Sequence, residues 1–252
     1  MMPKIRARPV GILPISDATE SGFPLFGRKI AIYLIFGLAT VVVLSCWGPP
    51  RQSNPTPPTS GGEIPYNPGL YNSDWTRLQF NNCYNYACNH DTFTFAQPGR
   101  HPDSHYTPPS GWDTCPWWRW NPQTRKVERG SMNCWKPQDI TCENLTQALI
   151  ADGWVPASCD QACPFSKYKK ALVLDPLTDA EKNDIYNDRG QVDFHFYRQN
   201  PDGTWSHKPG RSAVTNQTYD GLVMTDPRYA NRGNYTVFCG CFCCSTATTR
   251  KL

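Results

Sequence analysis

The chain has 252 residues, among them 12 Cys, 24 Pro and 9 Trp, but only 18% of its residues are charged. A mean hydropathy of -0.57 excludes a polytopic membrane protein. An aromatic fraction of 13% excludes a wholly disordered chain, because that much ring surface is enough to bury a core. The number of cysteines favours an oxidising compartment over the reduced cytosol.

The first expected element is an uncharged apolar run from Ile30 to Trp47. As a helix it covers about 27 Å, which is enough for the core of a bilayer. Five basic and two acidic residues precede it, so the positive-inside rule places residues 1–29 in the cytosol as a basic tail and everything after the run outside. We predict a transmembrane signal anchor at residues 30–47. A cleaved signal peptide and a lipoprotein acylated at Cys46 are the alternatives.

The net charge of +4 belongs mostly to this topology signal, since 20 basic and 19 acidic residues remain after Trp47. Such a balance indicates no nucleic-acid partner. The predicted partners are the membrane, through residues 30–47, and a peptide or glycan-associated substrate. Nothing in the sequence indicates the oligomeric state.

Residues 48–69 are rich in Pro, Ser, Thr and Gly and predict an extended linker, because such a segment buries little apolar surface. The remaining residues, 70–252, are enough for one disulfide-rich extracellular domain of the α+β class.

Few segments of this domain have a clear period. Residues 82–90 predict a short helix with an Asn cap, and 142–154 predict an amphipathic helix that ends at a glycine. The sequence also predicts a buried strand at 171–174 and a polar helix at 178–187. The strand at 192–199 alternates in polarity and turns through 200–203 into a return strand, which is the clearest hairpin. A closing strand is expected at 234–244.

Eleven cysteines follow the predicted membrane span, so an oxidised domain leaves at least one of them unpaired. We predict that Cys83 is that thiol. A zinc site is the alternative, since the run CGCFCC and the pairs Cys159-x3-Cys163 and His101-x3-His105 have suitable spacings. The exported context favours disulfides, and we predict no metal and no cofactor. The disulfide candidates are Cys88, Cys115, Cys134, Cys142, Cys159, Cys163, Cys239, Cys241, Cys243 and Cys244.

Cys83 is also the candidate nucleophile. It begins a predicted helix, where the positive end of the helix dipole stabilises a thiolate. On the predicted strand His195 shares one face with Asp193 and Tyr197, so it is the candidate base. His207 or Asn216 is the candidate orienting group. The alternatives are a structural half-cystine for Cys83 and a hydrogen-bonded strand histidine for His195.

A Cys at a helix start, a His on a hairpin strand and a polar residue downstream resemble the papain-like NlpC-type peptidases and CHAP amidases. That resemblance implies a small antiparallel sheet packed on the Cys-bearing helix, and thiol attack on a peptide or amide bond outside the cytosol. The sequence departs from the NlpC-type motif, because Asn82 precedes the Cys and Tyr84 follows it.

The strings NNCYNYA, TFAQPGR, HFYRQNPDGTWSHKPG and VTN are similar to another group of exported proteins, which includes insoluble shell-matrix proteins of molluscs. This resemblance covers roughly residues 80–244 and implies no reaction. It supports the alternative function, a non-enzymatic extracellular matrix or carbohydrate-contacting protein.

Four residues are candidates for substrate binding. Trp117 and Trp118 are flat rings of the kind that stack on sugars, with packing against disulfides as the alternative. Asn82 and Tyr197 neighbour the candidate nucleophile and base. Three N-x-T sequons also predict glycosylation sites if the source is eukaryotic, and at Asn216 a glycan would argue against a buried catalytic role. The sequons begin at Asn144, Asn216 and Asn234.

Overall fold

The computed structural model describes residues 54–100, 104–176 and 192–245. All described residues lie within the unit Trp47–Leu252. The predicted membrane span 30–47 and the predicted helix 178–187 therefore lie outside the described residues. No helix in the described part of the chain is long and apolar enough to cross a membrane.

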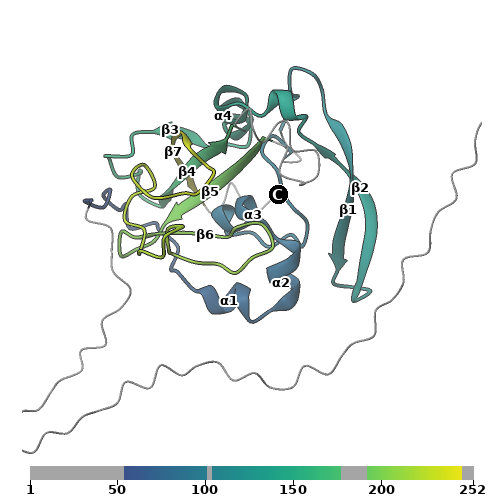
Figure 1. The fold of residues 1–252 in the computed structure, drawn as a ribbon, viewed down its shortest axis with the longest axis horizontal. Helices are drawn as coiled ribbons and strands as arrows, with labels where there is room; N and C mark the ends of the chain where they lie inside the picture. Colours follow the sequence, from purple (N-terminus) through teal and green to yellow (C-terminus); the bar gives the residue numbers. More distant parts are fainter. Residues whose placement is uncertain (1–53, 101–103, 177–191, 246–252) are drawn as a thin grey trace, which may run out of the picture. The chain divides into compact units, whose positions relative to one another are not determined.

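A five-stranded antiparallel sheet forms the centre of the domain (Figure 1). The hairpin predicted from residue 192 onward is confirmed, with Tyr197 opposite His207, and its turn closes through a bond of 2.7 Å from the Asn200 amide to the Thr204 carbonyl. The buried strand predicted at 171–174 is longer than expected. The closing strand predicted at 234–244 begins three residues later than expected. In spatial order the strands are β3 (Val155–Ala157), β7 (Val237–Ser245), β4 (Lys167–Asp175), β5 (Asp193–Gln199) and β6 (Trp205–His207).

The helices predicted at 82–90 and 142–154 are confirmed, as α3 (Cys83–Cys88) and α4 (Cys142–Ala151). Asn82 caps α3 as expected, and its side chain forms a reciprocal capping box with Asn85. Apolar side chains of both helices form one core with those of the sheet. Three short helical segments have no counterpart in the predictions: α1 (Pro68–Asn72), α2 (Trp75–Phe80) and η1 (Pro137–Asp139).

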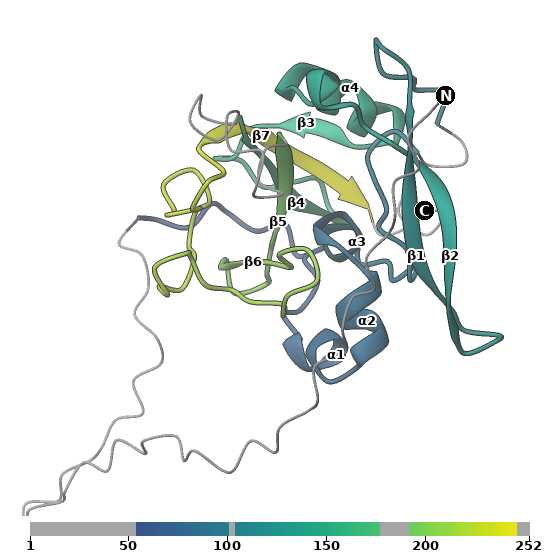
Figure 2. The same cartoon turned by 45° about the vertical axis from the view of Figure 1, so that its right-hand side comes forward.

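A second, two-stranded sheet consists of β1 (Asp113–Asn121) and β2 (Lys126–Cys134). Figures 1 and 2 show that α3 lies between the five-stranded sheet and this hairpin. The sequence did not predict the hairpin, because β1 (DTCPWWRWN) contains a proline and tryptophans on both of its faces and so lacks a simple alternation of polarity. The disulfide Cys115–Cys134 joins its two strands.

Residues 54–67, expected as part of a linker, pack against the domain. The amide of Gln199 donates to the Pro57 carbonyl at 2.5 Å, and the ammonium of Lys169 donates to the Pro58 carbonyl at 3.2 Å. Both donors belong to fully buried residues, which need acceptors. Proline carbonyls supply these acceptors without adding an N–H group that would itself need a partner.

Three of the four disulfides join β7 to segments on both faces of the sheet: Cys142–Cys239, Cys159–Cys241 and Cys163–Cys243. The register of β7 against β4 shifts between Leu172 and Val173, which places an extra residue opposite this point. Cys239 consequently packs with the core on the helix side, whereas Cys241 belongs to the cluster on the other side.

The prediction that Cys88 and Cys244 form disulfides is wrong, because both are free thiols. Cys244 follows Cys243 in the strand, so it points to the opposite face, toward the helices, and away from Cys163. The zinc alternative also fails for Cys159 and Cys163, whose sulfurs are oxidised. The described residues contain no group of three metal-ligating side chains.

Candidate functional site

Cys83 is a free thiol buried at the start of α3. Burial raises the pKa of this thiol to about 12, because a thiolate would lose its hydration there. The expected effect of the helix dipole is the opposite, but desolvation exceeds it in this six-residue helix. The thiol therefore stays protonated at neutral pH, which is unfavourable for a nucleophile.

Cys83 packs on the face of the sheet opposite to that of His195. Its cluster contains Phe196 and borders Phe194, and its Sγ lies 4.0 Å from the Phe194 carbonyl oxygen. His195 alternates with these phenylalanines and contacts Tyr197 on the other face, with the ring centroids 5.0 Å apart. The two side chains do not form the thiol–imidazole pair that a cysteine peptidase requires.

The structure brings the two candidate histidines together instead. His195 Nε2 lies 2.7 Å from His207 Nδ1, and His207 Nε2 lies 3.1 Å from the carbonyl oxygen of Gln217. A carbonyl only accepts, so His207 donates from Nε2 and accepts at Nδ1 from the Nε2–H of His195. Burial lowers the pKa of His195 well below its usual value and that of His207 to about 4. Both rings are neutral at physiological pH, which agrees with the role of His207 Nδ1 as an acceptor.

The group hydrogen-bonded to His195 is His207, one of the two predicted orienting candidates, and the Gln217 carbonyl in turn accepts from His207. The side chain of Asn216, the other candidate, takes part in neither bond. The Asn216 backbone carbonyl accepts from Met224, so the segment is fixed through its backbone. Sequence reasoning also missed Tyr235, whose hydroxyl donates to Asp193 at 2.7 Å and whose ring lies 5.1 Å from that of His195. No residue type in the sequence marks a backbone carbonyl as a partner.

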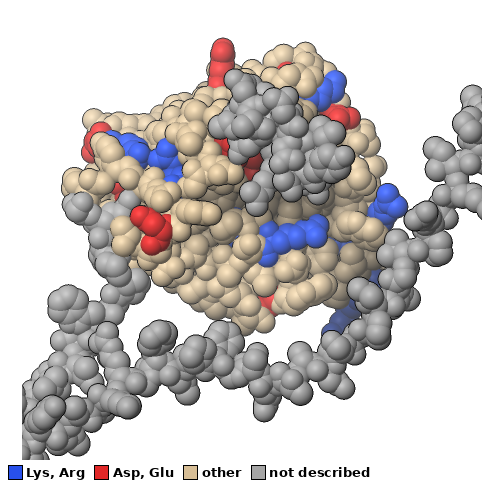
Figure 3. Space-filling model, in the orientation of Figure 1, with Lys and Arg blue, Asp and Glu red and all other residues tan. Residues whose placement is uncertain are grey.

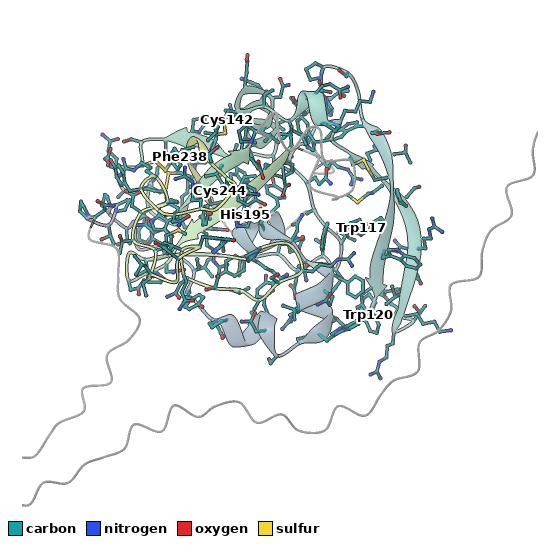
Figure 4. All side chains as sticks on the ribbon, in the orientation of Figure 1. Trp117, Trp120, Cys142, His195, Phe238 and Cys244 are labelled. Atoms are coloured by element: carbon teal, nitrogen blue, oxygen red, sulfur yellow. A yellow bond between two sulfur atoms is a disulfide. The ribbon has the colours of Figure 1, made fainter. Side chains whose placement is uncertain are left out.

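The two histidines line a cavity of about 770 Å³, which we call the histidine cavity. His195 extends from β5 (Figure 4) and lines this cavity. The described residues that line the cavity include several polar groups but no Cys and no Ser. A neutral imidazole pair there can hold or relay a proton, yet no Cys or Ser nucleophile lies beside it. The other polar and aromatic lining residues include Asp193, Tyr197, Gln217, Tyr219 and Tyr235.

A smaller cavity of about 320 Å³ lies between residues 94–100 and the β1–β2 hairpin, and we call it the arginine pocket. Trp117 lines it and packs on Phe95, with ring centroids 4.3 Å apart. Trp118 points to the outer face of the hairpin, where 46% of its surface is exposed and the guanidinium of Arg129 lies 5.8 Å from its ring. The two neighbouring tryptophans thus have different surroundings.

The remaining candidates have structural partners or stay predictions. The amide of Asn82 donates to the Ala96 carbonyl at 2.8 Å, so this side chain is engaged in capping and loop contacts. Asn144 lies in α4 and donates to the Asp139 carbonyl at 3.0 Å, whereas Asn234 is exposed. Glycosylation at the three sequons is untested.

No family model and no solved structure matches the chain, so the papain-like resemblance has no support from these comparisons. The chain is 31% identical over 160 residues to insoluble matrix shell protein 1 of Ruditapes philippinarum. That match covers 64% of this chain and 76% of the clam protein. It agrees with the resemblance to shell-matrix proteins that the sequence motifs indicated.

Proposed function

Because this chain belongs to the family of insoluble matrix shell protein 1, we propose that it is a non-enzymatic structural component of an extracellular matrix. Four disulfides in the described domain agree with an oxidising, extracellular location. The alternative function, a thiol amidohydrolase, requires a reactive Cys83.

The separation of Cys83 from both imidazoles carries this proposal. A thiol nucleophile needs a base within hydrogen-bonding reach or a pKa lowered toward neutrality. The Cys83 sulfur contacts a backbone carbonyl, its pKa is raised, and the two histidines are hydrogen-bonded to one another on the other face of the sheet.

The disulfide pattern supports a structural role. The three disulfides on β7 close segments of 97, 82 and 80 residues. In the entropic model, each such cross-link lowers the conformational entropy of the unfolded chain and so stabilises the folded state by about 4–5 kcal/mol. A domain held in this way keeps its shape outside the cell, where no chaperone refolds it.

The test combines thiol labelling with fractionation of the full-length protein produced by secreting cells. We expect a thiol-directed iodoacetamide probe to leave Cys83 unlabelled in the native protein and to label it after denaturation. We also expect both the wild type and Cys83→Ala to be recovered in the detergent-insoluble extracellular fraction. Circular dichroism establishes that the variant is folded.

Two results would overturn the proposal. One is rapid labelling of Cys83 in the native protein together with hydrolysis of peptide or amide substrates that Cys83→Ala abolishes, which would establish the amidohydrolase. The other is recovery of the secreted wild type entirely in the soluble fraction, which would contradict the structural role.

A further inference from the structure

The arginine pocket is a built cavity that the proposed function does not use. Its floor comes from residues 94–100, and its opposite wall comes from the face of the hairpin that carries Trp117 and Arg119. Its volume of about 320 Å³ lies at the lower end of the range for small-molecule sites. Trp117 extends from the hairpin toward the rest of the domain (Figure 4) and packs on Phe95.

The pocket has a positive charge. Of the described residues that line it, three are Arg and none is Asp or Glu. The guanidinium of Arg129 lies over Trp118 on the outer face, so the charge of the pocket comes from Arg100 and Arg119. Arg119 is partly neutralised by Glu128 at 3.0 Å, whereas Arg100 has no ion pair among the described residues. Arg211 adds a further guanidinium, 5.6 Å from the Phe95 ring and 6.0 Å from the Trp117 ring. In the view of Figure 3, Lys and Arg surface is visible at the centre and on the right, and also at the upper left.

Two polar atoms of the lining residues have no hydrogen-bonding partner among the described residues. Trp117 Nε1, a donor, and Gln97 Oε1, an acceptor, are both buried and unpaired in the described part of the chain. Buried polar groups in native proteins are almost always paired. After small side-chain rotations, a ligand in the pocket could pair both atoms by offering an acceptor to Trp117 Nε1 and a donor to Gln97 Oε1.

We propose that the arginine pocket binds an acidic unit of an extracellular polysaccharide. Guanidinium groups match the planar, multidentate oxygens of a carboxylate or a sulfate. Sugar hydroxyls both donate and accept, as the unpaired pair Trp117 and Gln97 requires. This inference deepens the proposed function and rests on it, because it names the polymer that such a matrix protein would hold.

A polysaccharide fits this wall better than an acidic peptide does. The carboxylate side chains of an acidic peptide bring acceptors only, so a donor for Gln97 Oε1 has to come from a backbone N–H, of which the peptide has one per residue. The hydroxyl groups of a sugar acid supply both. The pocket also has ring surface on Phe95 and Trp117, against which the apolar face of a sugar can lie.

The experiment measures binding of the purified full-length protein to chondroitin sulfate, polygalacturonate, neutral dextran and poly-L-aspartate by calorimetry. We expect binding to one or both acidic polysaccharides, and none to dextran. Chondroitin sulfate carries both sulfate and carboxylate groups and polygalacturonate carries carboxylates only, so binding to the first alone would show that the site requires sulfate. Binding should weaken as ionic strength rises.

Matched variants locate the site. The double variant Arg100→Gln/Arg211→Gln is expected to weaken binding by at least about tenfold. Arg125→Gln removes the same kind of charge from the exposed hairpin turn and is expected to change it by less than about twofold. Trp117→Phe keeps a ring but removes Nε1 and should weaken binding several-fold, whereas Trp118→Phe should not. Circular dichroism establishes that each variant is folded.

Three results would overturn the inference: no binding to either acidic polysaccharide, equal losses from Arg125→Gln and the double variant, or tighter binding to poly-L-aspartate than to the polysaccharides. The last would make the pocket an acidic-peptide site. None of them bears on partition into the insoluble fraction, so failure of this inference and failure of the structural role are distinguishable.

Discussion

The histidine cavity and the arginine pocket differ in how their polar groups are satisfied. In the histidine cavity His195, His207 and the Gln217 carbonyl form a closed series of hydrogen bonds. In the arginine pocket Trp117 Nε1 and Gln97 Oε1 have no partner among the described residues. The histidines that suggest catalysis therefore have their hydrogen bonds satisfied within the fold, whereas the pocket around Trp117 keeps two buried polar atoms unpaired among the described residues.

The two regions should also differ in how a substitution changes the free energy of unfolding. Removing one member of a satisfied buried pair leaves the other unpaired and costs stability, whereas removing an unpaired polar atom costs little or stabilises the fold. Substitutions in the two regions should thus differ in sign.

The largest effect is expected from His195→Ala. The substitution leaves His207 Nδ1 without its donor and empties space next to Tyr197, so the free energy of unfolding should fall by about 2–3 kcal/mol. Urea denaturation with intact disulfides measures it. The control His105→Ala removes an exposed imidazole and should change stability by less than about 0.5 kcal/mol. Equal stabilities of the two variants would mean that the histidine pair is not structural.

A pH titration tests the same pair without a mutation. The folded state holds the pKa of His207 at about 4, below the value of about 6.5 in an unfolded chain. Protons therefore bind preferentially to the unfolded chain, so stability is complete above about pH 6.5 and is lost as the pH falls toward 4. Between pH 7.5 and pH 5 we expect a loss of about 2 kcal/mol from His207.

The matched measurement for this titration is the same pH series on His207→Phe. That variant has lower stability throughout, but its stability should vary less with pH over this range. An identical slope in the wild type and the variant would contradict a depressed pKa for His207.

Tyr235→Phe should have a smaller effect. It removes the hydroxyl that donates to Asp193 at 2.7 Å, which should lower the free energy of unfolding by about 1 kcal/mol. The matched control is Tyr219→Phe, at a residue that lines the same cavity but is 82% exposed. Thermal unfolding of both variants measures the difference. A larger loss of stability in Tyr219→Phe would contradict the stabilising role of the Tyr235 hydroxyl.

The smallest effect is expected in the arginine pocket, with the opposite sign. Gln97→Met replaces an unpaired buried acceptor with an apolar group of similar length, so stability should stay unchanged or rise by up to about 1 kcal/mol. Urea denaturation checks this. A clear destabilisation would mean that Gln97 Oε1 has a partner in solution, such as bound water.

The local elements could be predicted where a short pattern determines them. The alternation in β5 and the Asn cap of α3 gave the hairpin and the Cys-bearing helix at nearly their observed bounds. The alternation also placed His195 with Asp193 and Tyr197. It did not reveal that Cys83 packs against the phenylalanine face, because that depends on which side of the sheet α3 covers.

Long-range partners could not be predicted for the same reason. The spacing of Cys239, Cys241 and Cys243 does not encode their partners, since the bulge in β7 changes which face the first of them takes. The arginine pocket depends on a loop and a hairpin that meet only in the folded domain.

The concentration of disulfides on β7 also sets an order of events during biosynthesis. Cys142, Cys159 and Cys163 enter the oxidising compartment 97, 82 and 80 residues ahead of their partners. Because a chain emerges from its N-terminus, these three thiols can mispair with one another before β7 arrives. Correct maturation therefore calls for disulfide isomerisation after synthesis, and secretion should slow when the cell's thiol-exchange catalysts are limiting.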